Sequence, residues 1–431
     1  MKKILFLLAI IFVFGIFASP TFAADYYVSP SGSSTGDGSM SNPWDLLTGN
    51  SRMRPGDTLI LKDGIYAVDT VNRGWLFLGP SGSTVRSIVK ADINARPIIT
   101  DIAVHTPNVF TNSFTRVESL WFGTPSKDTA EYVIQNGNDV ELVNNTYFNY
   151  FGGLNEGGST RNKYIGNRFI RSGHDNRGHS IYINNMMAKP GEGALIEKNI
   201  HIGKPLSFEG GYATHLWHNP GYVTVHNNFY GDVCYGIVVQ GKGNSVQDDI
   251  LWSSGGWQNV ALWLPTDNEY WPPPQDANNG KNVFTFRHNF LGPNNANRLV
   301  SPMTSYDPQV IIDDNYFVNI PGFGNNQKTL TLNDVPARLG VSGPELDTVI
   351  ANIENSFTGK TLQQIHDDQA IESNFKIISA VQDAWAGAGL IPGDLNRDGY
   401  VDINDMKIAL IGFDTPYTIF DLSKVITNFG K

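Results

Sequence analysis

Titratable side chains concentrate in residues 171–185, which read RSGHDNRGHSIYINN. Two imidazoles, a carboxylate and a guanidinium group fall within six residues of this segment, at His174, Asp175, Arg177 and His179. β-Elimination at a uronic acid needs a base beside the carboxylate and a cation that neutralises its charge. We therefore treat these four residues as candidate catalytic residues. The alternative is a polar corner whose histidine and aspartate side chains bond neighbouring turns.

The same segment continues into the apolar and polar alternation of a strand, where Tyr182 falls between Ile181 and Ile183. Successive side chains of a strand point to opposite faces, so Tyr182 should face away from the core and is a candidate substrate-binding residue. A second segment, YATHLWHN at 212–219, adds His215 and His218 as candidate catalytic residues. These two histidines could also bind a metal ion, but no Asp or Glu stands at a zinc-site spacing.

An adjacent acid pair, Asp248 and Asp249, follows these segments. Hydrolysis of a glycosidic bond uses two carboxyl groups, one protonated as acid and one acting as base, so this pair is a further catalytic candidate. In the alternative interpretation, Asp249 takes the place of an asparagine at a bend between strands.

Aromatic side chains cluster in WSSGGWQNVALWLPTDNEYWPPP, residues 252–274. Flat aromatic faces exposed in a row would form a platform for the C–H groups of sugar rings. The alternative is that some of these rings close the core beneath a long loop. The candidate substrate-binding residues are Trp252, Trp257, Trp263, Tyr270 and Trp271.

Oxygen donors alternate near the end of the chain, in GDLNRDGYVDIND at 393–405. Calcium prefers six to eight oxygen ligands, and alternate side chains of a turning loop converge on one point. Gly399 permits the sharp turn, and Tyr400 would contribute its backbone carbonyl. The alternative is a solvated turn rich in Asp and Asn. The expected calcium ligands are Asp394, Asn396, Asp398, Tyr400 and Asp405.

The spacing of this loop and the helical pattern MKIALIGF behind it resemble a type I dockerin. A dockerin normally carries two loop-helix repeats, whereas residues 417–430 match only the final part of the first repeat. The resemblance implies an α-helical module with one calcium ion and a cohesin-type scaffold protein as a partner. It also implies a carbohydrate-active domain ahead of the module, because dockerins usually accompany such domains.

The elements that must position these residues are indicated by a repeat through the middle of the chain. Two alternating apolar residues are followed by Asn or Asp and then by bulky residues, as in VELVNNTYF (140–148), VTVHNNFY (223–230) and VIIDDNYF (310–317). One such strand cannot bury its apolar face alone, but stacked coils share a continuous core. Asn suits the bend between strands. The pattern predicts an all-β, right-handed parallel β-helix, with a β-sandwich or propeller as the alternative. The aligned Asn and Asp positions are 145, 167, 199, 228, 249, 289 and 315.

The stretches DYYVSPSGSSTGDGSMSNPWDLL (25–47) and RPGDTLILKDGIYAV (54–68) resemble the opening of secreted β-helix proteins of the pectate-lyase-like superfamily. That superfamily includes lyases, hydrolases, epimerases and tailspikes, so the resemblance is specific for the fold and weak for the chemistry. The polygalacturonase motifs are absent as a set: an Asp-Asp pair and a Gly-His fragment occur in reverse order.

Composition and termini set the remaining expectations. The chain has 431 residues, a net charge of −10, no basic block and one cysteine, Cys234. This argues against a nucleic-acid partner and excludes an intrachain disulfide. Residues 1–23 are typical of a secretory signal peptide, with an uncleaved membrane anchor as the alternative. We expect a β-helix domain over 24–323, a flank or cap over 324–392 and the dockerin-like module over 393–431.

These features together predict a secreted, monomeric protein with no membrane association after signal cleavage. It would cleave an extracellular polysaccharide, by hydrolysis or by β-elimination, and bind Ca²⁺ in its tail. The alternatives are a non-catalytic glycan-binding or adhesion protein and a structural surface protein.

Overall fold

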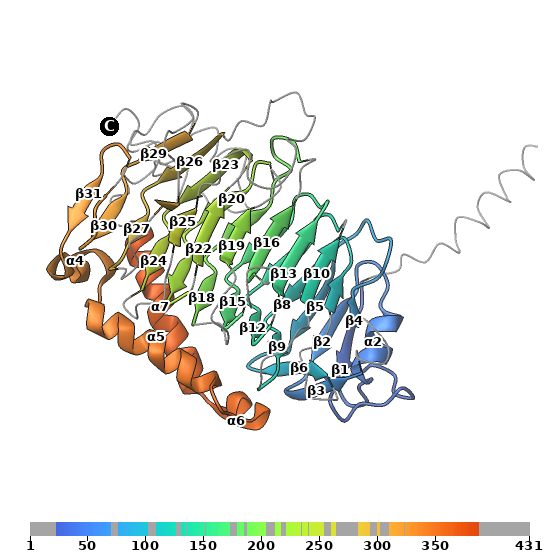
Figure 1. Ribbon diagram of the computed structural model, residues 1–431. Coiled ribbons are helices and arrows are strands. Elements are labelled where there is room, and N and C mark those ends of the chain that lie inside the picture. The colour runs from blue at the N-terminus through green and yellow to red at the C-terminus, as the bar shows by residue number, and fades with distance from the viewer. Residues whose placement is uncertain are drawn as a thin grey trace, which may run out of the picture.

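The computed structural model describes residues 23–69, 76–101, 109–125, 131–135, 137–150, 152–172, 179–184, 188–203, 212–216, 221–233, 235–239, 241–253, 260–263, 283–293, 300–301, 310–322 and 324–387. Within these ranges the chain winds through three parallel sheets, and, apart from the first and last pairings, each strand pairs with the third strand that follows it (Figure 1). This confirms a mostly β fold of the parallel β-helix type and excludes the sandwich and the propeller. The right-handed sense of the coil stays a prediction.

The three sheets are called A, B and C. In the described chain, sheets A and B have 11 strands each and sheet C has 9. Sheet A contains β1 (Asp25–Val28), β2 (Thr58–Leu61), β5 (Ser87–Ala91), β8 (Thr115–Glu118), β11 (Glu141–Val143), β14 (Lys163–Ile165), β17 (Leu195–Glu197), β20 (Thr224–His226), β23 (Lys242–Gln247), β26 (Val283–Arg287) and β29 (Val310–Asp313). Sheet B contains β3 (Gly64–Val68), β6 (Pro97–Asp101), β9 (Trp121–Gly123), β12 (Thr146–Phe148), β15 (Arg168–Ile170), β18 (Ile200–Ile202), β21 (Phe229–Gly231), β24 (Ile250–Trp252), β27 (Phe290–Leu291), β30 (Tyr316–Val318) and β31 (Lys328–Leu330). Sheet C contains β4 (Leu76–Leu78), β7 (Val109–Thr111), β10 (Glu131–Gln135), β13 (Gly152–Gly157), β16 (Ile181–Asn184), β19 (Tyr212–Leu216), β22 (Tyr235–Val239), β25 (Val260–Trp263) and β28 (Val300–Ser301).

One apolar cluster fills the interior between the sheets. Val140, Val223 and Ile312 come from coils far apart in sequence, and all three belong to this cluster. The expectation of a single core shared by stacked coils is thereby confirmed. Stacking buries side chains that a lone strand would leave in water, so each coil is stabilised by its neighbours.

Aromatic side chains from sheet B form a stack inside this core. The register pairs Phe122, Tyr147, Phe169, His201 and Tyr230 in successive coils. Their ring centroids are 5.4, 5.0, 4.8 and 4.8 Å apart along the stack. Burial lowers the pKa of His201 to about 3, so this imidazole is neutral and packs as an aromatic ring.

The corner between sheets A and B carries a ladder of amides. In seven coils it has two residues, the first with a positive φ between 50° and 66°. The second residue is the Asn or Asp of the repeat. For example, Oδ1 of Asn199 accepts from the backbone N–H of Asn167 at 2.9 Å and from its Nδ2 at 3.1 Å. The left-handed residue makes the bend, and the amide satisfies backbone groups that the bend removes from the sheets. The ladder residues are Asn145, Asn167, Asn199, Asn228, Asp249, Asn289 and Asn315.

Helices from the second half of the chain cover sheet B. They are α4 (Val335–Leu339), α5 (Gly343–Phe357), α6 (Leu362–Asp367) and α7 (Ala370–Gly387), after the 3₁₀ turn Leu332–Asp334. A second apolar cluster joins their buried faces to sheet B, from Ile98 in an early coil to Val318 in a late one. The flank expected over the last coil therefore runs along the length of the stack (Figure 1). α2 (Leu46–Arg52) packs at the other end, beside β1 and β4.

Polar contacts anchor this flank at α6 and at the start of α7. Nη1 of Arg96 donates to the carbonyl oxygens of Ile365, His366 and Asp368 at 2.8 to 3.0 Å. Arg168 binds both carboxylate oxygens of Glu372 at 2.7 and 2.9 Å. Among the described helices, none is long and apolar enough to cross a membrane.

Candidate functional site on the outer face of sheet C

Of the three sheets, sheet B is covered by helices, whereas His179 and His215, two of the histidines singled out in the sequence, lie at sheet C. Ile181 and Ile183 are buried in the core, so Tyr182 between them lies on the outer face. On the next strand, Leu216 belongs to the core and Thr214 contacts the core residue Tyr230. His215 therefore faces outward, and the register pairs it with Tyr182.

The structure brings two separate sequence segments together at this point. The ring nitrogens His179 Nε2 and His215 Nδ1 are 2.8 Å apart, although 36 positions separate the two residues. The ring of Tyr182 stacks on His179 with centroids 5.4 Å apart, and it meets His215 edge-on at 5.2 Å. Both histidines are 6% exposed. The result is a close cluster of two imidazoles and a phenol on the outside of the coil.

Tyr212 completes the cluster, and it was not among the residues expected to act there. Its ring lies 4.6 Å from that of His215, and its backbone N–H donates to Nδ1 of His179 at 3.1 Å. Tyr212 opens the segment YATHLWHN. The signal that could have found it is its place at the start of that strand, one coil after His179.

These contacts fix where the protons of the histidine pair lie. Because Nδ1 of His179 accepts from a backbone N–H, a neutral His179 carries its proton on Nε2. That Nε2–H then donates to Nδ1 of His215. His215 in turn carries its own proton on Nε2. The pair thus presents His215 as a hydrogen-bond donor, whereas a general base would need an open lone pair at that nitrogen.

Tyr182 adds a second neutral donor beside the pair. Burial raises the pKa of Tyr182 to about 12, so its hydroxyl keeps its proton at neutral pH. A phenol and an imidazole N–H in one cluster suit the stabilisation of negative charge, such as a sugar carboxylate or a departing glycosidic oxygen.

Several sequence candidates lie outside the described residues. They include His174, Asp175 and Arg177, which precede His179, and His218, which follows His215. The aromatic candidates Trp257, Tyr270 and Trp271 are also outside, and for Trp263 only the backbone of β25 is described. These residues stay predictions. The calcium loop, with Asp394, Asn396, Asp398, Tyr400 and Asp405, likewise lies outside the described residues.

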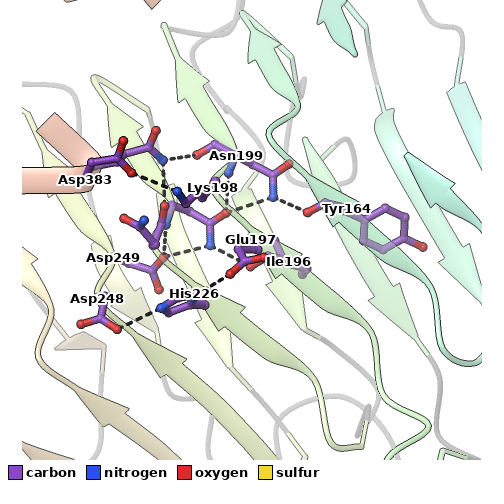
Figure 2. Close-up of polar contacts among 12 residues, drawn as sticks. Tyr164, Ile196, Glu197, Lys198, Asn199, His226, Asp248, Asp249 and Asp383 are labelled. Atoms are coloured by element: carbon purple, nitrogen blue, oxygen red, sulfur yellow. Dashed lines mark hydrogen bonds and ion pairs between the residues drawn. The ribbon is translucent and has the colours of Figure 1, made fainter. Parts of the chain in front are cut away.

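The acid pair belongs to another part of the fold. Asp249 is fully buried and occupies one position of the amide ladder, where its Oδ1 accepts from Asn228 at 2.6 and 2.9 Å (Figure 2). Asp248 is the left-handed residue before it, with φ 60°. The corner between sheets A and B, not the face of sheet C, holds both carboxyl groups. The prediction that this pair is catalytic is therefore corrected, and the bend interpretation of Asp249 is confirmed.

Asp248 has a structural environment of its own at that corner. Its carboxylate lies 3.2 Å from Nε2 of His226 and 2.7 Å from Nδ1 of His288. His226 also contacts Glu197 at 3.0 Å, and His288 stacks on Trp385 of α7 at 4.4 Å. This network ties the corner to the helical flank. Within the part of the chain that the structure describes, no three His, Cys, Asp or Glu side chains are placed to hold a metal ion.

Trp252 is also not a surface residue. It is fully buried between sheet B and the helical flank, and its Nε1 donates to Asp347 of α5 at 2.7 Å. The interpretation of Trp252 as a sugar platform is therefore wrong. The alternative, in which part of the aromatic segment closes a core, is confirmed for this residue.

Several solved structures have a distant similarity to this chain. No protein-family model matches the chain, and no curated protein matches its sequence. Among solved structures it is similar to an alginate lyase from a Paenibacillus species, with 12% identity and a TM-score of 0.47 over 72% of this chain and 97% of that one. It is also similar to a rhamnogalacturonan lyase, with 12% identity and a TM-score of 0.46 over 72% and 87% of the two chains.

A third similar structure is a lacto-N-biosidase from Eubacterium ramulus, with 13% identity and a TM-score of 0.44 over 72% of this chain and 67% of that one. At such identities and TM-scores, the similarity carries no argument about the reaction. The assignment of the fold rests on the strand pairings, and the function must be argued from the site.

Proposed function

We propose that the protein is a secreted enzyme that cleaves an extracellular polysaccharide on the outer face of sheet C. The observation that carries this proposal is the hydrogen-bonded pair His179–His215 in contact with Tyr182. Three side chains from two coils meet there, each able to donate or accept a proton.

β-Elimination on a uronic-acid polymer fits the described groups better than hydrolysis. Hydrolysis needs a pair of carboxyl groups at the scissile bond, and Asp248–Asp249, the pair expected to supply them, lies at another corner. In β-elimination, a base removes the proton beside the carboxylate, the bond to the leaving oxygen breaks, and a carbon–carbon double bond forms. Donors must stabilise the charge that grows on the carboxylate and protonate the leaving oxygen.

His215 and Tyr182 match the donor roles in this scheme. The imidazole of His215 would stabilise the charge on the carboxylate, and the hydroxyl of Tyr182 would protonate the leaving oxygen. His179 is a positioning residue, because it holds the proton of His215 on Nε2. His174 and His218 remain candidates for the base, and Arg177 for the neutralising cation.

The test is turnover of polygalacturonate, alginate and xylan, followed by ultraviolet absorbance for the unsaturated product and by reducing ends for either reaction. We expect His215→Ala and Tyr182→Phe to lower kcat by about 10²- to 10⁴-fold, the usual contribution of a proton-transferring group. The matched control is His366→Ala on α6, which contacts Asp63 and Asp367 instead of the cluster. Full activity of His215→Ala would contradict the proposal.

His179 provides a sharper check of the proton assignment. His179→Gln keeps an amide N–H that could donate to Nδ1 of His215, whereas His179→Ala removes the donor. We expect the Gln variant to recover a large part of the kcat that the Ala variant loses, with similar KM in both. Retention on polysaccharide gels without any product would instead favour a non-catalytic glycan-binding protein.

We further propose that the tail, residues 393–431, is a dockerin-like module that binds one Ca²⁺ and attaches the enzyme to a cohesin-type scaffold protein. The alternating oxygen donors of the loop, and the helical pattern behind it, support this proposal. Calorimetric titration of the full chain with Ca²⁺ would test it, with a stoichiometry of one expected.

A further inference from the structure

An exposed aromatic pair lies at the first-coil end of sheet C. Phe77 on β4 is 49% exposed, and its ring centroid is 5.2 Å from that of Phe110 on β7. Phe110 is half-buried, so the pair presents one exposed aromatic ring backed by a second. Leu76 and Leu78 on either side of Phe77 are buried, so the strand directs only Phe77 outward.

The strand register connects this pair to the histidine site. Phe77 pairs with Phe110, and Phe110 pairs with Val133. The row then continues through the backbone positions Asn155 and Tyr182 to His215. Neighbouring strands lie about 4.8 Å apart, so Phe110 is about 19 Å and Phe77 about 24 Å from His215 along the stack. The row is therefore a single outer line that leads from the aromatic pair to the cluster.

We propose that Phe77 and Phe110 form a distal sugar-binding subsite, occupied by the same polysaccharide chain whose reacting bond lies at His215 and Tyr182. This rests on the proposed function. A pyranose ring in an extended chain advances by a length close to one strand spacing. A chain laid along the row thus places about three sugar rings between the ring at His215 and the ring at Phe110. The C–H face of a sugar packs on an aromatic face. Phenylalanine has no polar group, so this contact breaks no hydrogen bond of its side chain.

The proposal makes the enzyme selective for long chains. A trisaccharide that reacts at His215 is too short to reach Phe110, whereas an octasaccharide covers the whole row. Contact of the distal sugars with Phe77 and Phe110 would raise kcat/KM for the long substrate alone, either through a lower KM or through a higher kcat.

The test uses trisaccharides and octasaccharides prepared from whichever of polygalacturonate, alginate and xylan the wild-type protein cleaves. We expect Phe77→Ala and Phe110→Ala to lower kcat/KM for the octasaccharide by about three- to tenfold each, the usual value of one aromatic contact, and to leave the trisaccharide unchanged. Phe77→Trp should retain the wild-type value. The control is Ile93→Ala, at a residue that is 86% exposed elsewhere on the surface. Melting temperatures confirm that all variants fold.

Equal effects on both substrates, or no effect on either, would overturn the proposal. A wild-type dimer that Phe77→Ala converts to a monomer would overturn it too, by assigning the pair to self-association. If none of the polymers is cleaved, affinity electrophoresis in gels of the three polymers replaces the kinetics. Retention lost in Phe77→Ala but kept in His215→Ala would then uphold the subsite while the proposed cleavage fails.

Discussion

Asp249 is the one acid in a ladder of asparagines, and it should make the stability of the β-helix depend on pH. Its Oδ1 takes the acceptor role of the neighbouring amides, binding the backbone N–H and Nδ2 of Asn228. Its Oδ2 takes the place of an amide nitrogen and has no hydrogen-bond partner among the described residues. In the next ladder position, the corresponding Nδ2 of Asn289 donates to the Val246 carbonyl and to Oδ1 of Asn315. An ionised Oδ2 in such a position would face acceptors instead of donors.

Burial raises the pKa of Asp249 from 3.8 to about 7. Below pH 3.8, both the folded and the unfolded chain hold the proton, so the group has no effect on stability. Between pH 3.8 and about 7, the folded chain keeps a proton that the unfolded chain has released, so stability falls as pH rises. Above about pH 7 both states have released the proton, and the stability does not decrease further through this group. A shift of this size corresponds to about 4 kcal/mol, at 1.36 kcal/mol for each pH unit.

Replacement of Asp249 by Asn should remove this dependence, because the amide supplies the missing donor and carries no charge. We expect the stability advantage of Asp249→Asn over the wild type to grow by about 3 kcal/mol between pH 5 and pH 8. Urea unfolding at a series of pH values measures the difference through the transition midpoint of the β-helix.

Asn199→Asp is the matched control, because it places a second acid in an equivalent ladder position. It should destabilise the protein at pH 8 and much less at pH 5. A constant difference between Asp249→Asn and the wild type at every pH would refute the reasoning, since it would mean that Asp249 is ionised throughout or that its burial is not retained in solution.

Two further predictions concern the buried His201 and the expected calcium loop. Burial lowers the pKa of His201 to about 3, so as the pH drops below about 6.5 the unfolded chain takes up a proton that the folded chain does not, and the stability of the fold decreases. His201→Phe should remove this acid sensitivity while keeping the stack with Phe169 and Tyr230. Thermal melts from pH 4 to 7 would measure the difference. Chelation of Ca²⁺ should unfold residues 393–430 and leave the β-helix folded, and Asp398→Ala should have the same effect; hydrogen exchange that shows no change in the tail after chelation would contradict this.

The sequence by itself determined the repeated unit of this protein. Alternation of apolar residues such as Val223 and Val225 fixes which face of each strand is buried, because side chains of a strand alternate in direction. The recurring Asn marks the bend, because its side chain satisfies the backbone groups that a corner exposes. Both signals act within a few residues, so they can be read without the fold. The same logic anticipated Asp249 as a ladder residue.

Only the tertiary structure decided which outward side chains meet. His179 and His215 are adjacent because one full coil separates them, and the length of that coil depends on loops that follow no periodic rule. Trp252 is buried by a helix that begins about ninety residues later, which no local pattern around it could indicate. Alignment of Phe77 with the histidine site likewise depends on register summed over several strand pairs. Local chemistry therefore fixed the rungs and their corners, while long-range packing and register decided where a site could form.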